Sequence, residues 1–248
     1  MTTLNFYGEN GFTSLIFEAL VRHEGGIRML LGNLKRFDEP RTLFAVDELI
    51  GDENAEIWLF PNFGKRYGFG EPDALVLVAG HAFWFEVETD VGLGPRLQAG
   101  APLRQLFRFH CAASAFSAPV TTRGSGRGRK RSIVGVTLTN EDERRDAAID
   151  VAEHLIGRLL PRLKGTTSHF VLFSVHRPQG ESDGWQRTLV RRAPEHFDAW
   201  NQIMGFGPAD AMPITRCWYT YWYKDLRKKF IAMGGPDPLK NYVEIKRV

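Results

Sequence analysis

Two β-rich runs that meet at a short turn constrain the fold of this chain more than any other feature. The runs are Asp73–Ala79 and Phe83–Thr89, and Gly80-His81 joins them. β-Branched and aromatic side chains on both sides of a glycine turn are typical of a β-hairpin. The sequence therefore predicts a hairpin, and with it a β-sheet.

Three acidic residues lie on this hairpin at positions that predict a cluster. Successive side chains of a strand point to opposite faces, so Glu86 and Glu88 share one face at about 7 Å from each other. If the hairpin closes symmetrically about Ala79 and Gly80, Asp73 lies across from Glu86, with Cβ atoms about 5 Å apart. Each carboxylate raises the cost of ionising the next, so we expect the cluster to need a cation.

The type of ligand indicates the type of cation. Hard carboxylate oxygens favour Mg²⁺ or Mn²⁺, whereas zinc prefers His or Cys ligands, which this hairpin lacks unless His81 folds back. The alternative is that Glu86 and Glu88 are solvated acids on an exposed sheet face, the usual environment of a Glu-x-Glu pair. Asp73, placed opposite them after Pro72, favours the cluster.

Apolar periodicity and turn residues predict the elements around the hairpin. In chain order they are a helix and a second short helix within Phe12–Leu34 interrupted at Gly25-Gly26, a short helix over Thr42–Ile50, a strand over Glu56–Phe60, a helix over Pro102–Phe116, a strand over Ile133–Thr139, a helix over Glu141–Leu163, a strand over His169–Val175, a helix over Glu195–Met204 and a strand-like aromatic segment over Arg216–Lys224. This mixture predicts an α/β protein.

Composition and charge limit the remaining choices. With 248 residues, 43% of them apolar, the chain can bury the core of one domain, and its net charge of +3 is too mild to indicate a polyanionic partner by itself. Two distant cysteines, Cys111 and Cys217, indicate a reduced intracellular protein. Met1–Gly11 lacks the regions of a signal peptide, and no run of about 18 apolar residues is present. We therefore expect a single cytoplasmic domain over residues 1–248.

Two segments carry the basic residues that bear on nucleic-acid binding. The first is a glycine- and serine-rich stretch, 121–132, which we expect to be a mobile loop that contacts phosphates, with a solvated linker as the alternative. Its cations are Arg123, Arg127, Arg129, Lys130 and Arg131. In the second, the aromatic residues Tyr219, Tyr221, Trp222 and Tyr223 precede the cations Lys224, Arg227, Lys228 and Lys229. These aromatic side chains either stack on bases or pack in the core.

The hairpin acids also carry a resemblance to a known family. Gly70-Glu71-Pro72-Asp73, followed after 12 residues by Glu86-Val87-Glu88, resembles the signature of the PD-(D/E)XK nuclease superfamily, with Glu88 where the usual lysine stands. Glu18 on the first helix is placed like the acidic residue that members often carry before the hairpin. Gln105 to Phe109 resembles the Gln-x-x-x-Tyr motif of the RecB-like branch, with Gln98 as a rival for its glutamine.

Each flanking residue also has an ordinary structural interpretation. Glu18 can pair with Arg22 one helical turn away, and Gln105 can be an exposed helix residue. The resemblance implies a restriction endonuclease-like core over about 12–139, a central mixed sheet flanked by helices in αβββαβ order. The C-terminal elaboration then covers about 140–248.

The resemblance implies an activity: Asp73 and Glu86 hold Mg²⁺ or Mn²⁺, and water hydrolyses a phosphodiester bond of DNA, which is favoured over RNA. Glu88 has the wrong sign for the role of the family's lysine, so it either accepts a proton or holds a second metal ion. A cation could instead come from Lys65, Arg66 or Arg96. The implied partner is nucleic acid, with no membrane role and with a homodimer left open.

Two alternatives remain at this stage. The missing lysine is compatible with a catalytically inactive module of the same fold that binds nucleic acid or a protein partner. A pair of close carboxylates is also compatible with a retaining glycosidase, although nothing in the sequence indicates a sugar-binding cleft.

Overall fold

The computed structural model describes twelve segments of the chain. They are residues 8–37, 39, 42–45, 54–61, 71–89, 105–110, 112–113, 131–133, 136–138, 157–159, 161–175 and 218–240. The expected helix at Glu195–Met204, most of the basic loop and residues Lys65, Arg66, Arg96 and Gln98 lie outside these segments.

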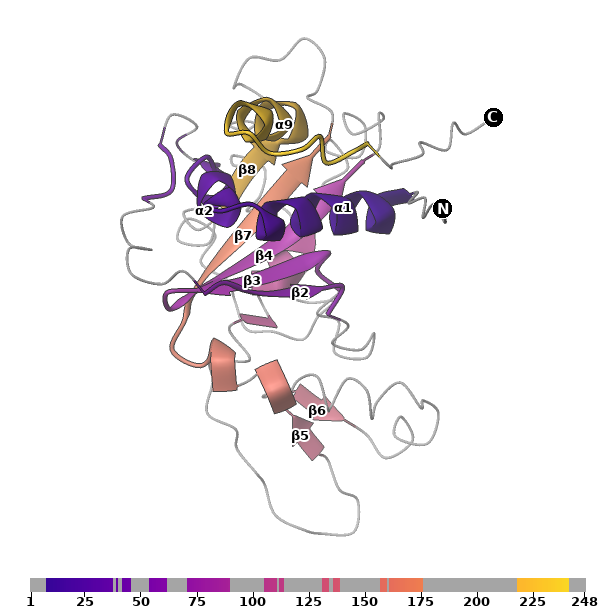
Figure 1. Cartoon of the computed structure of the whole chain (residues 1–248). Coiled ribbons are helices and arrows are strands. Elements are labelled where there is room, and N and C mark those ends of the chain that lie inside the picture. Colours follow the sequence, from indigo (N-terminus) through magenta and orange to yellow (C-terminus); the bar gives the residue numbers. More distant parts are fainter. Residues whose placement is uncertain are drawn as a thin grey trace.

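The main sheet of the described segments has six strands in the order β1-β8-β7-β4-β3-β2 (Figure 1). The strands are β1 (Lys35–Arg36), β2 (Glu56–Leu59), β3 (Ala74–Val78), β4 (His81–Glu88), β7 (Thr167–Ser174) and β8 (Trp218–Trp222). Strands β2, β3 and β4 are antiparallel neighbours, whereas β4, β7 and β8 run parallel. The expected α/β class with a mixed sheet is confirmed.

The predicted hairpin is formed by β3 and β4. Its register runs from Val78 opposite His81 to Ala74 opposite Phe85, so the turn is centred between Ala79 and Gly80, as predicted. Both turn residues have positive φ angles, 47° at Ala79 and 75° at Gly80. Two-residue turns of this kind match the twist of the flanking strands, which is why the glycine is a strong hairpin signal.

Three helices cover one face of this sheet: α1 (Gly8–Arg22), α2 (Gly26–Leu31) and α9 (Tyr223–Ala232), all seen on the same side in Figure 1. The predicted break between the first two helices is confirmed. Gly25 has a φ of 73°, and a Cβ on Gly26 would lie 2.3 Å from the carbonyl oxygen of Leu20. None of the described helices is long and apolar enough to cross a bilayer.

The hydrophobic core lies between these helices and the sheet. Alternate residues of the strands point into it, as the period of two requires. Its buried members include Phe12, Ile16, Phe17 and Leu20 of α1, Val76, Phe83, Phe85 and Val87 of the hairpin, Val171 and Phe173 of β7, Tyr219 and Tyr221 of β8, and Leu226 and Phe230 of α9. Because this face is occupied by apolar side chains, charged groups on the hairpin belong to the other face or to the sheet edge.

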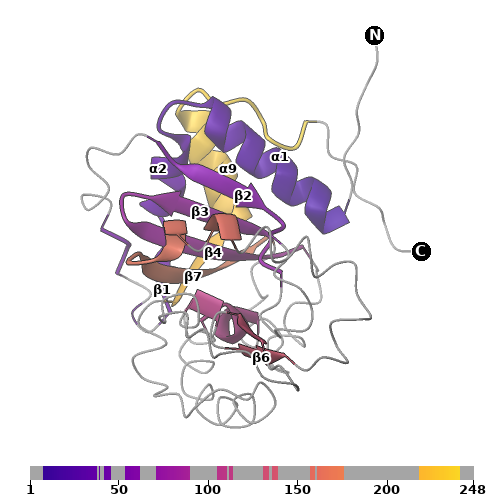
Figure 2. The same ribbon diagram turned by 90° about the horizontal axis from the view of Figure 1, so that it is seen from below.

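The opposite face of the sheet is covered by short helical segments at 105–110, 112–113, 157–159 and 161–163. Trp84 of β4 stacks on Phe109 with ring centroids 6.2 Å apart, and His110 packs on Phe170 at 5.3 Å. Seen from below in Figure 2, the segments within 157–163 lie in front of the sheet and α1 lies beyond it. Helices therefore flank the sheet on both sides.

Two expected elements differ from the structure. Residues 42–45 are not helical, because Leu43 pairs with Lys35 in an isolated β-bridge. The expected strand Ile133–Thr139 is confirmed only in part: Ile133 belongs to β5 (Arg131–Ile133) and residues 136–138 form β6 (Val136–Leu138), and these two strands pair in a separate two-stranded sheet. The parallel partner of β4 is β7 instead. A short β-rich run does not specify its partner strand, because pairing depends on contacts between distant parts of the chain.

Candidate functional site

One edge of the main sheet gathers the acidic side chains. Glu88, the last residue of β4, is in register with Ser174, the last residue of β7, and Ser174 is in register with Trp222, the last residue of β8. Asp73 immediately precedes β3 at the same edge. Glu9, in the first turn of α1, reaches this edge too, since its Oε2 accepts a hydrogen bond from the hydroxyl of Thr89 at 3.4 Å.

Asp73 is held firmly against β4. Its backbone N–H donates to the carbonyl oxygen of Phe85 at 2.9 Å, and its Oδ2 accepts the N–H of Val87 at 2.6 Å. The side chain is 9% exposed. The Asp73 carboxyl group therefore lies beside the peptide that separates Glu86 from Glu88.

Glu86 and Glu88 lie on the same face of β4, as predicted. They alternate with Phe85 and Val87, which point into the hydrophobic core. Glu88 is 2% exposed and Glu86 is half-buried. Glu88 is thus not a solvated group on an open sheet face, whereas Glu86 remains partly accessible.

The surroundings of the Asp73 carboxyl group disfavour its ionised form. The pKa of Asp73 is raised to about 7, mainly because the carboxyl group is buried; the Val87 N–H lowers this pKa, and the neighbouring acids Glu9, Glu88 and Glu71 contribute to raising it, in that order. The charged groups that shift this pKa are all acidic. Near neutral pH the Asp73 carboxyl group is therefore shared between its protonated and ionised forms, and a bound cation would favour ionisation.

The first helix contributes Glu9 to this edge, not Glu18. Glu18 is 44% exposed and forms an ion pair with Arg22 at 2.6 Å, which is the ordinary structural interpretation of this residue. Glu18 lies nine positions after Glu9, about 13 Å further along the helix axis. Sequence reasoning missed Glu9, because the predicted helix begins at Phe12, whereas α1 begins at Gly8 and has Glu9 in its first turn.

Gln105 lies on the side of the sheet that carries Glu86 and Glu88. It is half-buried, and its Oε1 accepts a hydrogen bond from Nη1 of Arg108 at 2.9 Å. The neighbouring Phe109 stacks on Trp84, two residues before Glu86 on β4. Gln105 is therefore not an exposed helix residue.

The described acids are close to one another without forming a complete metal cage. Among the residues that the structure describes, no three His, Cys, Asp or Glu side chains lie in position to hold a metal ion. The chemistry of the acids would nevertheless suit a hard divalent cation, since their donor atoms are carboxylate oxygens and other carboxylates contribute to raising the Asp73 pKa. Mg²⁺ and Mn²⁺ fit this donor set better than Zn²⁺.

The sequence also suggested basic and aromatic residues as candidates for nucleic-acid binding. Tyr219, Tyr221, Trp222 and Tyr223 are buried, so they pack in the core and are not exposed for base stacking. The basic loop residues Arg123, Arg127, Arg129 and Lys130 lie outside the described segments, and Arg131 is the first residue of β5. The exposed cations of the C-terminal segment lie on α9.

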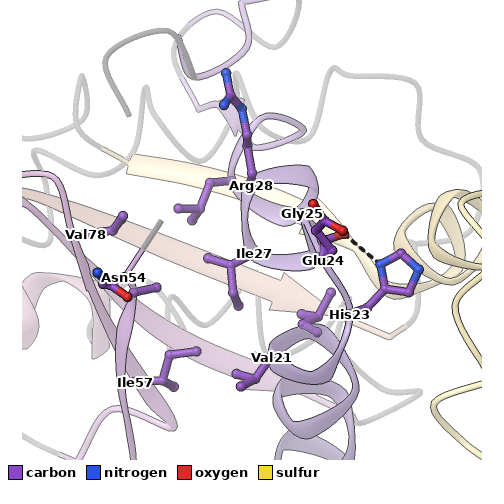
Figure 3. Close-up of a pocket in the computed structure, with 13 residues that line it drawn as sticks. Val21, His23, Glu24, Gly25, Ile27, Arg28, Asn54, Ile57 and Val78 are labelled. Atoms are coloured by element: carbon purple, nitrogen blue, oxygen red, sulfur yellow. Dashed lines mark hydrogen bonds between the residues drawn. The ribbon is translucent and has the colours of Figure 1, made fainter. Parts of the chain in front are cut away.

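A pocket of about 720 Å³ lies at the other end of the sheet, away from the acids. It is lined by the α1–α2 junction, the start of β2 and Val78 at the end of β3. In Figure 3 the side chains of Ile27 and Ile57 line the pocket, while Arg28 extends away from them and the His23 ring is bonded to the carbonyl oxygen of Glu24. Because its polar groups do not converge, this pocket is a weaker candidate than the acidic edge.

The fold and this edge together define an α/β protein with a desolvated acidic cluster where three parallel strands end. No family model matches the chain, and no curated protein or solved structure is detectably similar to it. An α/β fold by itself does not define a function, so the residues of the site carry the functional information.

Proposed function

We propose that this protein is a metal-dependent nuclease that hydrolyses phosphodiester bonds of DNA with Mg²⁺ or Mn²⁺. The observation that carries the proposal is the Asp73 carboxyl group, whose pKa is raised to about 7 by burial and by Glu9, Glu88 and Glu71. A fold that keeps a carboxyl group in such surroundings loses stability at neutral pH, and perturbed acids of this kind cluster at functional sites. A divalent cation relieves the repulsion.

The order of the elements supports a restriction endonuclease-like core. Helix α1 precedes strand β2 and the β3–β4 hairpin, which are followed by the helical segment at 105–113 and by β7 parallel to β4. With α2, β1, β5 and β6 left out, these elements follow the αβββαβ order that the resemblance of the Asp73 to Glu88 motif to the PD-(D/E)XK superfamily implies. The strand that completes the order is β7, and not the segment 133–139.

The residues of the edge have distinct roles in this proposal. Asp73 and Glu86 would hold the cation, with Glu9 of α1 as a further acidic group, and the Val87 N–H orients the Asp73 carboxyl group by its hydrogen bond. A cation held there supplies Lewis-acid polarisation of the scissile phosphate. Glu88 stands in the place of the family's lysine but carries the opposite charge. It would therefore accept the proton of the attacking water or help to hold a second cation.

The test is cleavage of plasmid and linear DNA by the purified protein with Mn²⁺ or Mg²⁺ and without metal. Asp73→Ala should abolish cleavage, and Glu88→Gln should reduce it by roughly 10²–10⁴-fold if Glu88 is the general base. Glu18→Gln is the matched control, because it removes an acid of α1 that is paired with Arg22 on the surface. Cleavage that persists in Asp73→Ala would reject the assignment.

A second candidate is a catalytically inactive module of the same fold that binds nucleic acid or a protein. Glu88 in the place of the lysine favours it, as does the absence of a complete metal cage among the described residues. Titration with Mn²⁺ separates the two candidates. The nuclease should bind Mn²⁺ saturably and lose that binding in Glu86→Gln, whereas the inactive module should show no binding that depends on Glu86.

A further inference from the structure

Helix α9 presents its apolar side to the core and its lysines to solvent. Tyr223, Leu226 and Phe230 are buried, one helical turn apart. Lys224, Lys228 and Lys229 are exposed. We call these three lysines the basic face of α9.

The basic face begins at the acidic edge. Helix α9 follows β8 directly, and Trp222 at the end of β8 is in register with Ser174, which is in register with Glu88. From there the ten residues of α9 run for about 15 Å toward α2. Lys229, near the far end, donates a hydrogen bond to Oδ1 of Asn33, which follows α2.

Several cations of the described segments pair with carboxylates, whereas no described contact joins a lysine of this face to one. Arg22, Arg162 and Arg227 each pair with a carboxylate, and Arg227 binds Asp237 through two hydrogen bonds of 3.1 and 2.6 Å. Lys229 is bonded to a neutral amide instead. Within the described part of the chain, Lys224 and Lys228 have no hydrogen bond or ion pair.

The surroundings of the lysines indicate what they would bind. The apolar stripe of α9 is already buried in the core, so the helix has no continuous apolar side for insertion into a bilayer. The aromatic side chains before it are buried and cannot stack on bases. Flexible, exposed lysines attract phosphates without reading sequence.

We propose that the basic face of α9 binds the backbone phosphates of a nucleic acid and leads its strand to the acidic edge. The identity of the partner rests on the proposed function, whereas the position of the surface rests on the register of β4, β7 and β8. Binding along α9 is electrostatic and independent of base sequence. It places a phosphate-attracting surface beside a site that would otherwise repel a polyanion.

The test measures binding of a short DNA duplex as a function of salt concentration, in the full chain carrying Asp73→Asn and without divalent metal. The double variant Lys224→Gln/Lys228→Gln should weaken binding and make the negative slope of log K against log[salt] less steep by roughly 2. The change should be the same for DNA duplexes of unrelated sequence. The matched control is Arg158→Gln/Lys164→Gln, which removes two exposed cations from the other side of the sheet. The control variant should bind like its parent.

The outcomes separate this inference from the nuclease proposal. An unchanged slope in the α9 variant would overturn the role of α9, even if Asp73-dependent cleavage is observed. A reduced slope in a protein that never cleaves would support the role of α9 and overturn the nuclease proposal. Lysine-dependent binding to phosphatidylserine vesicles, with no binding to DNA, would overturn the inference in favour of a membrane surface.

Discussion

The two ends of the β4–β7 pair bury titratable side chains in opposite ways. At the start of the strands, Nδ1 of His81 and Nε2 of His169 are 2.9 Å apart, and the rings of Phe44 and Phe83 pack on His169 at 5.0 and 4.7 Å. At their end, the Asp73 carboxyl group lies beside Glu88 and Glu9. We refer to these as the histidine end and the acidic end.

Burial shifts the pKa of a titratable group at each end, but only the His169 imidazole is fully uncharged at neutral pH as a result. Burial, followed by the proximity of His81, lowers the pKa of His169 to about 3, so this imidazole is uncharged and hydrogen-bonded at neutral pH. Burial and like charges raise the pKa of Asp73 only to about 7, so its charge is not removed. The comparison teaches that burial is enough to keep His169 uncharged at neutral pH, whereas it leaves the Asp73 carboxyl group partly ionised beside other acids.

The largest effect on this comparison is expected from Asp73→Asn. A raised carboxyl pKa contributes stability that is fully present below about 3.8 and is lost as pH rises through about 7. The amide keeps an oxygen that can accept the Val87 N–H, so at pH 8 in EDTA the variant should be more stable by about 2–4 kcal/mol. Urea unfolding between pH 4 and pH 8 measures the difference.

Glu18→Gln is the control for this measurement, because it removes one acid from an exposed ion pair. Its stability should change by less than about 0.5 kcal/mol at every pH. If Asp73→Asn lowers stability at pH 8, the acidic end is not under repulsive strain, and the contrast with the histidine end disappears.

The next largest effect is expected at the histidine end, where stability depends on pH in the opposite direction. His169 has a lowered pKa, so its contribution to stability is present above 6.5 and is lost as pH falls toward about 3. His169→Phe should therefore gain roughly 2–3 kcal/mol relative to the wild type between pH 7 and pH 4. Thermal or urea unfolding at the two pH values measures this gain.

A second buried histidine provides the reference for that experiment. Burial lowers the pKa of His110 to about 4, so His110→Phe should give a gain of the same sign and smaller size. Equal acid sensitivity in His169→Phe and the wild type would show that the histidine pair is not the acid-sensitive group.

The smallest effect is expected at the turn that joins the hairpin at the histidine end. Ala79 has a φ of 47°, which an alanine adopts at a cost, whereas asparagine tolerates this region better. Ala79→Asn should stabilise the protein by about 0.5–1 kcal/mol, and Gly80→Ala should destabilise it by about 1 kcal/mol through its φ of 75°. Both values follow from urea midpoints, and two changes of the same sign would contradict the turn geometry.

The part of the candidate site on the hairpin could be predicted from the sequence. A symmetric turn at Ala79-Gly80 gives the register, and alternation then places Glu86 and Glu88 on one face. The contribution of α1 could not be predicted in this way. Glu9 and Glu18 are both acids of one helix, and only the packing of Phe12 and Phe17 against the sheet decides which of them reaches Asp73.

The partner strands of the hairpin were equally beyond local reasoning. The segment 133–139 and β7 both have strand-like composition, yet β7 pairs with β4 over eight residues from His81 to Glu88. The aromatic strand β8 then lies next to β7 and becomes buried. Such choices depend on which distant segments bury the most apolar surface together.

The sequence by itself determined the hairpin, its register and the break between α1 and α2, because turns with positive φ and the alternation of side chains are properties of neighbouring residues. Only the tertiary structure decided that Glu9 joins Asp73, that β7 is the parallel partner of β4, and that α9 starts where the acids gather. These features depend on contacts between residues far apart in the chain, whose stability comes from burial of shared surface and not from local preference.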